Sequence, residues 1–387
     1  MKLRRLFCLL LAFCIPMLTA GCGKDAPVVT DVVTPEVPPI ATAVTIGDHK
    51  LTAVEFNYYY RDAVDDFYND WANSYILGTE VADFDPSAPL NEQYYNAEAD
   101  ITWADHLIQE ALKNAKQDYI LSDLAKAEGF TLPAEYQAEL ESQQEIIATY
   151  ANLYGYANID SFLGAYYGPQ CNETNYMAYI ERQVISDAYA NSHRESLTYS
   201  EDVLRSRDTG EYEACPMGNV RHLLVKFESG TTNEVTIEIT YSDAEKEAAR
   251  MKAEEYLDMW KNGAANEEYF IELVKAHSQD GHPENGGLYQ NIHPGSNYVT
   301  AFRNWATDPA RQPGETDIIE TEYGYHVMYF VSWSDLNYRD YMITEQLRDA
   351  DQEAWLQETL DAVEAEILDY SGLELDMVLD PGGQETE

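Results

Sequence analysis

Two histidines and one aspartate stand where they could take part in a catalytic site. His222 and His326 each lie in a stretch of alternating, β-branched residues that predicts a strand, and Asp280 lies in a loop just before Gly286 and Gly287. Each residue also has an ordinary explanation. A strand histidine is more often a core or surface residue, a loop aspartate often caps its own turn, and paired glycines shape a turn without doing chemistry. No cysteine and histidine spacing indicates a metal site.

The stretch 214–335, which contains these residues, has the pattern of one small α/β domain. Its expected elements are strands at 219–228 and 234–241, helices at 242–262 and 267–276, a turn-rich loop at 281–287, an irregular segment at 290–298, a short helix from 299 and a strand at 325–333. A β-α-α-α-β order follows, and it would place both histidines on strands.

The sequence on both sides of this domain is mainly helical. A short strand is expected at 43–48, Thr52 and Glu55 fit a capping box, and Thr102 fits a helix cap within a mostly helical segment, 91–128. Tyr58, Tyr59 and Tyr60 are expected to pack in the core. We predict an α+β fold in which a helical domain is interrupted by the α/β domain and then resumed. The expected parts are a signal peptide at 1–21, a tether at 22–41, helical sequence at 42–213, the α/β domain at 214–335, a returning helix at 336–372 and a tail at 373–387.

Four motifs inside 214–335 resemble those of parvulin-type peptidyl-prolyl cis/trans isomerases, in the same order. They are RHLLV at 221–225, FIELVKAHSQD at 270–280, NGGL at 285–288, and PGE at 313–315 followed by YGYHV at 323–327. By their general pattern, the flanking helical segments are similar to those of PrsA-like foldase lipoproteins and of SurA-type chaperones. The resemblance therefore implies a parvulin-like domain set into a helical chaperone-like domain.

The same resemblance implies a role for each matching residue. The two histidines would sit back to back on adjacent central strands and share a hydrogen bond, and the aspartate would lie beside the bound peptide bond. One position in the proline pocket holds Tyr298, where many relatives have methionine. The implied catalytic residues are His222, Asp280 and His326, the implied proline pocket is Leu288, Tyr298 and Phe302, and the implied polar rim is Lys226 and Thr321.

The function implied is cis/trans isomerisation of X-Pro bonds in unfolded or partly folded exported polypeptides, with no cofactor and no metal. One alternative is a holdase chaperone whose parvulin domain binds peptide without catalysing. Another is a solute-binding lipoprotein, which would need two large α/β lobes where this sequence predicts one small α/β segment. A monomer and a homodimer both remain open.

The N-terminus predicts export and a lipid anchor. Basic residues precede an apolar stretch at 6–18 that is short for a membrane span, and the following LTAGC ends in Cys22. This ending resembles a lipoprotein signal, in which Cys22 carries the lipid, and the alternative is an ordinary signal peptide cut near Ala20. We expect an extracytoplasmic protein anchored to the cell membrane of a Gram-positive bacterium. Of the cysteines beyond Cys22, Cys171 and Cys215 are expected to be free thiols rather than a disulfide.

The charge of the chain excludes nucleic acid as an electrostatic partner. The sequence has 24 lysines and arginines against 69 aspartates and glutamates, and its formal net charge is −45. Such a surface repels nucleic acid and anionic lipid headgroups, so the membrane contact is expected through the lipid on Cys22.

Overall fold

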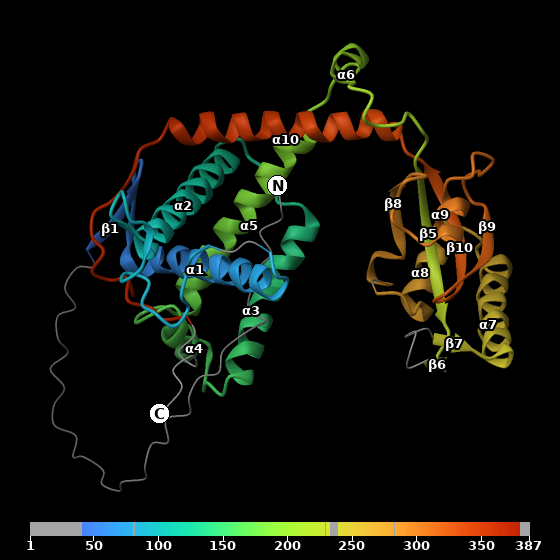
Figure 1. Cartoon of the computed structure of the whole chain (residues 1–387), viewed down its shortest axis with the longest axis horizontal. Helices are drawn as coiled ribbons and strands as arrows, with labels where there is room; N and C mark the ends of the chain where they lie inside the picture. The colour runs from blue at the N-terminus through green and yellow to red at the C-terminus, as the bar shows by residue number, and fades with distance from the viewer. Residues whose placement is uncertain (1–40, 80–81, 229, 233–238, 282, 380–387) are drawn as a thin grey trace, which may run out of the picture. The chain divides into compact units, whose positions relative to one another are not determined.

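The computed structural model describes residues 41–79, 82–228, 230–232, 239–281 and 283–379. It divides into two compact units, Met1–Leu197 with Asp349–Glu387, and Thr198–Arg348. Figure 1 follows the chain from its first described strand, in blue, to its last helix, in red. The predicted α+β class is confirmed, since helices dominate the first unit and an antiparallel sheet forms the centre of the second. No helix within the described ranges is both long and apolar enough to cross a membrane.

The first unit combines a small antiparallel sheet with several helices. Its sheet has the strand order β11-β1-β2, so β1 pairs with a neighbouring strand and with one from near the C-terminus. The elements are β1 (Thr42–Ile46), β2 (His49–Thr52), α1 (Ala53–Ile76), β3 (Tyr94–Asn96), β4 (Ile101–Thr102), α2 (Trp103–Ala127), α3 (Ala134–Leu153), α4 (Ile159–Tyr166), α5 (Glu173–Ser196), the end of α10 (Tyr338–Asp361) and β11 (Ala365–Ile367).

The two predicted caps are confirmed, whereas two predicted helical segments are shorter than expected. Thr52 and Glu55 form the capping box of α1, and the Thr102 hydroxyl accepts a hydrogen bond from the Asp105 N–H at the start of α2. Because Thr102 is the cap, α2 cannot extend back to residue 91, and the preceding residues pair instead as β3 and β4. The returning helix predicted at 336–372 ends at Asp361, and the chain then forms β11.

The core of the first unit is rich in tyrosine. The side chains of Tyr58, Tyr59 and Tyr60 on α1 are buried, as predicted. The ring of Tyr58 stacks on that of Tyr179 with centroids 5.2 Å apart, and it meets the Tyr167 ring at 4.8 Å. These tyrosines therefore join α1 to α5 and to the segment after α4.

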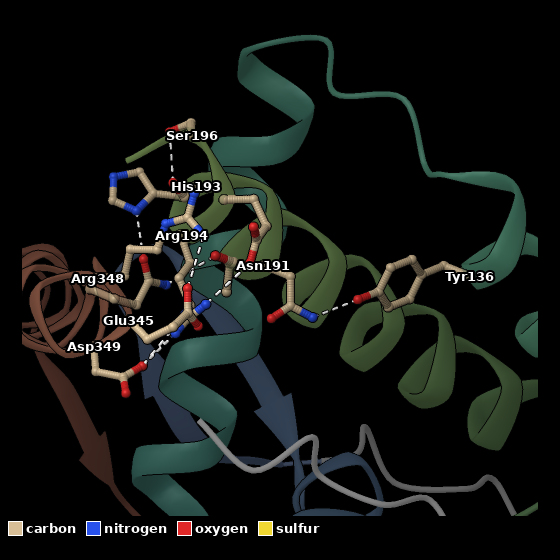
Figure 2. Close-up of polar contacts among 11 residues, drawn as sticks. Tyr136, Asn191, His193, Arg194, Ser196, Glu345, Arg348 and Asp349 are labelled. Carbon is tan, nitrogen blue, oxygen red and sulfur yellow. Dashed lines mark hydrogen bonds and ion pairs between the residues drawn. The ribbon is translucent and has the colours of Figure 1, made fainter. Parts of the chain in front are cut away.

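The last part of α10 packs on α5 within the first unit, as the close-up in Figure 2 shows for Arg194 and Asp349. Arg194 donates hydrogen bonds from Nε and Nη2 to Oδ1 of Asp349, at 3.1 and 2.9 Å. The His193 imidazole stacks on Trp355 at 3.8 Å, and its Nδ1 lies 2.6 Å from Oε1 of the buried Gln352. These contacts explain why a sequence-distant helix completes this unit.

The second unit contains a four-stranded antiparallel sheet with the order β8-β5-β10-β9. Helices α7 and α8 pack on one face of the sheet, and α9 packs on the other. The elements are α6 (Glu201–Arg207), β5 (Gly218–Lys226), β6 (Gly230–Thr232), β7 (Ile239–Tyr241), α7 (Asp243–Asn262), α8 (Glu267–His277), a 3-10 turn (Pro283–Asn285), β8 (Leu288–Ile292), α9 (Thr300–Ala306), β9 (Thr316–Thr321) and β10 (Gly324–Trp333).

This sheet corrects the predicted β-α-α-α-β order, because β8 and β9 add two strands to it. Residues 290–298 were expected to be irregular, yet the first of them belong to β8 and pair with β5. Of the strand expected at 234–241, residues 234–238 lie outside the described residues and 239–241 form β7. The unit also extends beyond 214–335 on both sides, from Thr198 to Arg348. On the C-terminal side, the Tyr338 N–H donates to the Cys215 carbonyl, and the Tyr338 ring stacks on His293 at 3.6 Å. The thiols of Cys171 and Cys215 are free, and Cys171 is buried.

Candidate active site

The alternation of side chains along β5 and β10 brings two histidines to one face of the sheet. Leu223 on β5 and Val327 on β10 belong to the core under α7 and α8, so their sequence neighbours point to the opposite face. His222 and His326 accordingly face α9, where their rings lie 5.1 and 5.8 Å from that of Phe302. The strands that carry them are adjacent and central in the sheet.

The two imidazoles form a buried hydrogen-bonded pair. Nδ1 of His222 lies 2.9 Å from Nδ1 of His326, and the side chains are 3% and 5% exposed. The expected hydrogen bond between them is therefore present. Burial, followed by the neighbouring His222, lowers the pKa of His326 to about 3. At neutral pH the His326 imidazole is uncharged.

Neighbouring groups contact both ends of this pair. The Thr321 hydroxyl accepts a hydrogen bond from the Tyr323 N–H at 3.2 Å and donates one to the Gly324 carbonyl at 3.3 Å, and its oxygen lies 2.8 Å from Nε2 of His326. At the other end of the pair, Nε2 of His222 faces the Asp280 loop.

That loop is attached to the free edge of β5, beyond the end of β8. The Ser278 hydroxyl accepts from the Leu224 N–H at 3.1 Å, and the Gln279 N–H donates to the Leu224 carbonyl at 2.9 Å. The Gln279 side-chain oxygen accepts from the Lys226 N–H at 2.8 Å. These hydrogen bonds to the backbone of β5 fix Asp280 next to the strand that carries the first histidine.

Asp280 is the solvent-facing end of the group. Its Oδ2 lies 3.3 Å from Nε2 of His222, at an angle short of a hydrogen bond, and accepts a hydrogen bond from the Tyr289 hydroxyl at 2.8 Å. The side chain is 21% exposed. The His222 imidazole, followed by the Tyr289 hydroxyl, holds the pKa of Asp280 well below its usual range, although partial burial acts in the opposite direction. Asp280 is therefore an ionised carboxylate at neutral pH.

Three aromatic rings form a wall beside these polar groups. The Phe302 ring is buried, and its centroid lies 5.6 Å from that of Tyr289 and 5.6 Å from that of Tyr298. Tyr298 is partly exposed, so the wall extends from the sheet toward solvent. Tyr298 and Phe302 are thus brought together with the histidine pair, as the sequence suggested.

The strand register places Tyr289, and not Leu288, beside Phe302. Leu288 pairs with Arg221 and Tyr289 pairs with Val220, and paired residues of antiparallel strands point to the same face. Leu288 therefore faces the α8 side, and Tyr289 faces the histidines. Reading 288–292 as a strand would have revealed this, but its polar residues hid the strand signal.

A glycine turn and two rim residues complete the surroundings of the site. The His222 N–H donates to the Gly287 carbonyl at 3.0 Å, and a Cβ at Gly287 would lie 2.3 Å from the His222 carbonyl oxygen. With φ at +66°, this position requires glycine. Thr321 contacts the histidine pair, whereas Lys226 is exposed and joins the group through its backbone N–H.

These residues can bind an apolar ring against the aromatic wall while polar groups act on an adjacent amide. The polar groups are a buried imidazole pair, in which His326 is uncharged, and an ionised carboxylate, all held by regular strands and loop hydrogen bonds. Across the described ranges, His, Cys, Asp and Glu form no group of three that could hold a metal ion.

Comparison with known proteins identifies the segment that carries this site. The family model of the PPIC-type PPIase domain, described as a rotamase, matches residues 222–332. No curated protein matches the chain. Among solved structures, PrsA from Bacillus subtilis is 16% identical, with 76% of this chain and 100% of that chain covered and a TM-score of 0.37. PrsA from Streptococcus pneumoniae is 17% identical, with 71% of this chain and 93% of that chain covered and a TM-score of 0.24. A structure of SurA-like chaperones from Campylobacter jejuni is 15% identical, with 62% of this chain and 88% of that chain covered and a TM-score of 0.24.

Proposed function

We propose that this chain, whose residues 222–332 match the family model of the PPIC-type PPIase (parvulin) domain, catalyses cis/trans isomerisation of X-Pro bonds. The observation that carries this proposal is the convergence of His222, His326 and Asp280 beside the Phe302 ring, inside the segment that the family model matches. The substrates are unfolded or partly folded polypeptides that contain X-Pro bonds.

The proposed mechanism is stabilisation of a twisted amide without covalent chemistry. Partial double-bond character gives the peptide bond a rotation barrier of about 18–20 kcal/mol. The aromatic wall would hold the pyrrolidine ring of proline while the rest of the peptide rotates. In this mechanism, the fixed dipoles of the imidazole pair and the charge of Asp280 interact more favourably with the twisted amide than with either planar isomer, and this difference lowers the barrier. Their burial and hydrogen bonding mean that little reorganisation is needed during rotation.

The proposed setting is the outer face of the cytoplasmic membrane, where the protein acts as a foldase for exported chains. What supports it is the basic and apolar leader at 1–21 with the lipoprotein-like ending at Cys22, all outside the described residues. A lipid on Cys22 would hold the protein at the membrane. Replacing Cys22 with alanine is expected to move the protein from the membrane fraction to the soluble fraction. Continued sedimentation with membranes after a salt wash would contradict the anchor.

A proline-peptide assay tests the isomerase proposal. Peptides with an X-Pro bond are brought to a non-equilibrium cis content, and relaxation is followed with and without the purified protein. The proposal predicts relaxation that accelerates in proportion to protein concentration. An unchanged rate, with suppression of aggregation of an unfolded client still present, would replace the isomerase by a holdase. An unchanged rate without such suppression would remove both functions.

A further inference from the structure

Tyr289 contacts three parts of the candidate site at the same time. Its ring meets the His222 imidazole edge-on with centroids 4.9 Å apart, and it meets the Phe302 ring at 5.6 Å. Its hydroxyl donates a hydrogen bond to Oδ2 of Asp280 at 2.8 Å. None of the sequence motifs pointed to this residue, and its place follows from the register of β8 with β5.

We propose that Tyr289 is a positioning residue, which fixes the carboxylate of Asp280 against His222 and thereby sets the rate of X-Pro isomerisation. This inference rests on the proposed function, because the rate that it concerns is that of the isomerase. It assigns no contact with substrate to the Tyr289 hydroxyl, which acts through the carboxylate.

The geometry at one oxygen atom supports this role. Oδ2 of Asp280 accepts the hydroxyl of Tyr289 and also faces Nε2 of His222 at 3.3 Å. The approach of His222 falls short of hydrogen-bond geometry, so the hydroxyl is the better-aligned partner of the carboxylate. With Oδ2 engaged on both sides, rotation of the carboxylate is restricted and the direction of Oδ1 is fixed.

The hydroxyl is delivered by a rigid element, whereas Asp280 stands on a loop. Tyr289 belongs to β8, which pairs with the central strand β5, and its ring is enclosed by those of Tyr298 and Phe302. Groups held by strands and packed rings are positioned more accurately than groups on loops. Burial, with the nearby carboxylate, raises the pKa of Tyr289, so the hydroxyl stays protonated and remains a donor at neutral and alkaline pH.

A double-mutant cycle in the full-length protein tests the proposal. The variants are Tyr289→Phe, which keeps the ring and removes the hydroxyl, Asp280→Ala, and the combination of both. Tyr289→Phe is expected to lower kcat/KM about tenfold, mainly through kcat, since a hydrogen bond to a charged group is lost while the aromatic wall is kept. The double variant is expected to be no slower than Asp280→Ala, because Tyr289 acts through the carboxylate.

Tyr325→Phe is the matched control. The Tyr325 hydroxyl donates to Oε2 of Glu320 at 3.0 Å, in the same domain but on the face of the sheet opposite the histidine pair. Its removal is expected to leave kcat/KM unchanged. Losses that multiply in the double variant, or wild-type kcat/KM in Tyr289→Phe, would overturn the positioning role.

A second readout does not depend on activity. NMR titration of the Asp280 carboxyl group is expected to show a higher pKa in Tyr289→Phe than in the wild type, and no change in Tyr325→Phe. An unchanged Asp280 pKa would overturn the proposed contact. If the wild type failed to isomerise proline peptides but the pKa rose as expected, the isomerase proposal would fall, and with it the effect on rate, while the Tyr289 contact with Asp280 would stand.

Discussion

At the scale of single residues, the site passes from a buried imidazole pair to a partly exposed carboxylate. His222 and His326 are 3% and 5% exposed, and Asp280 is 21% exposed. Removing either imidazole would leave its partner unsatisfied in the interior, at a cost of about 1–3 kcal/mol. The loop carboxylate can be removed with less loss of packing, so it is the better residue with which to test function.

We predict that Asp280→Ala lowers isomerisation about tenfold or more and leaves suppression of client aggregation intact. The reason is that the carboxylate lies in the second unit, whereas we expect the helical first unit to bind the unfolded client. Peptide relaxation and light scattering of an unfolding client measure the two effects on the same preparation. His222→Ala should also lose activity, but a melting curve must first show that this variant is folded at the assay temperature. Full isomerisation by Asp280→Ala would rule out a catalytic role for that residue.

The sequence could predict which residues meet, but not all of their neighbours. The four motifs occur in the same order as in parvulin-type isomerases, and they contain or flank His222, Asp280, Phe302 and His326. The structure brings these side chains together. Tyr289 was missed because a one-residue difference in a strand reverses the face to which a side chain points. Only the pairing partners across the sheet decide that face.

At the scale of elements, the packing of α1 against α5 includes a partly buried carboxylate. Asp62 on α1 accepts a hydrogen bond from the Tyr167 hydroxyl at 3.2 Å and another from Tyr179 on α5. Loss of hydration, with smaller effects of Asp65 and Asp66, raises the pKa of Asp62 to about 7. The folded state therefore binds this proton more tightly than the unfolded chain does.

This difference predicts how stability depends on pH. The contribution of protonated Asp62 is fully present below the unfolded pKa of about 4, and it is lost as pH rises through about 7. Asp62→Asn is expected to flatten this part of the stability curve and to raise the stability at pH 8 by on the order of 1 kcal/mol. Denaturant unfolding between pH 5 and pH 8 measures it. Asp70→Asn removes an exposed charge from the same helix as a control, and equal effects of both variants would contradict the assignment.

Local sequence signals were sufficient where an element is capped or strongly periodic. The capping box at Thr52 and Glu55 set the start of α1, and alternating residues located β5 and β10. The signal failed at β8, where polar Gln290 and Asn291 interrupt the strand pattern, and at β11, which exists by pairing with β1. Strands that are specified mainly by their partners carry too little local information to be predicted.

At the scale of the whole molecule, the chain consists of two units that share α10, with the division between Arg348 and Asp349. The second unit uses the first part of this helix: Arg339 pairs with Asp208 at 3.3 Å, and Gln346 donates to the Tyr212 hydroxyl at 2.9 Å. Motifs alone located the segment that carries the candidate site, but they carry no information about these supporting contacts.

We therefore predict that residues 198–348 fold as an isolated fragment and melt about 3–8 °C higher than residues 214–335. The shorter fragment lacks Tyr338, so the stacking on His293 cannot form. It also lacks both partners of the Arg339–Asp208 and Gln346–Tyr212 contacts. Thermal unfolding followed by circular dichroism compares the two fragments. Equal melting temperatures would show that the start of α10 does not stabilise the domain.

The most direct test of the central claim joins site and activity in one experiment. NMR exchange spectroscopy follows cis/trans interconversion of an X-Pro peptide while the imidazole resonances of His222 and His326 in the full-length protein are recorded. We predict that the protein accelerates exchange, and that the peptide shifts both imidazole resonances over the same concentration range. Exchange at the uncatalysed rate, or catalysis with both resonances unmoved, would contradict the claim that this histidine pair lies at an isomerase site.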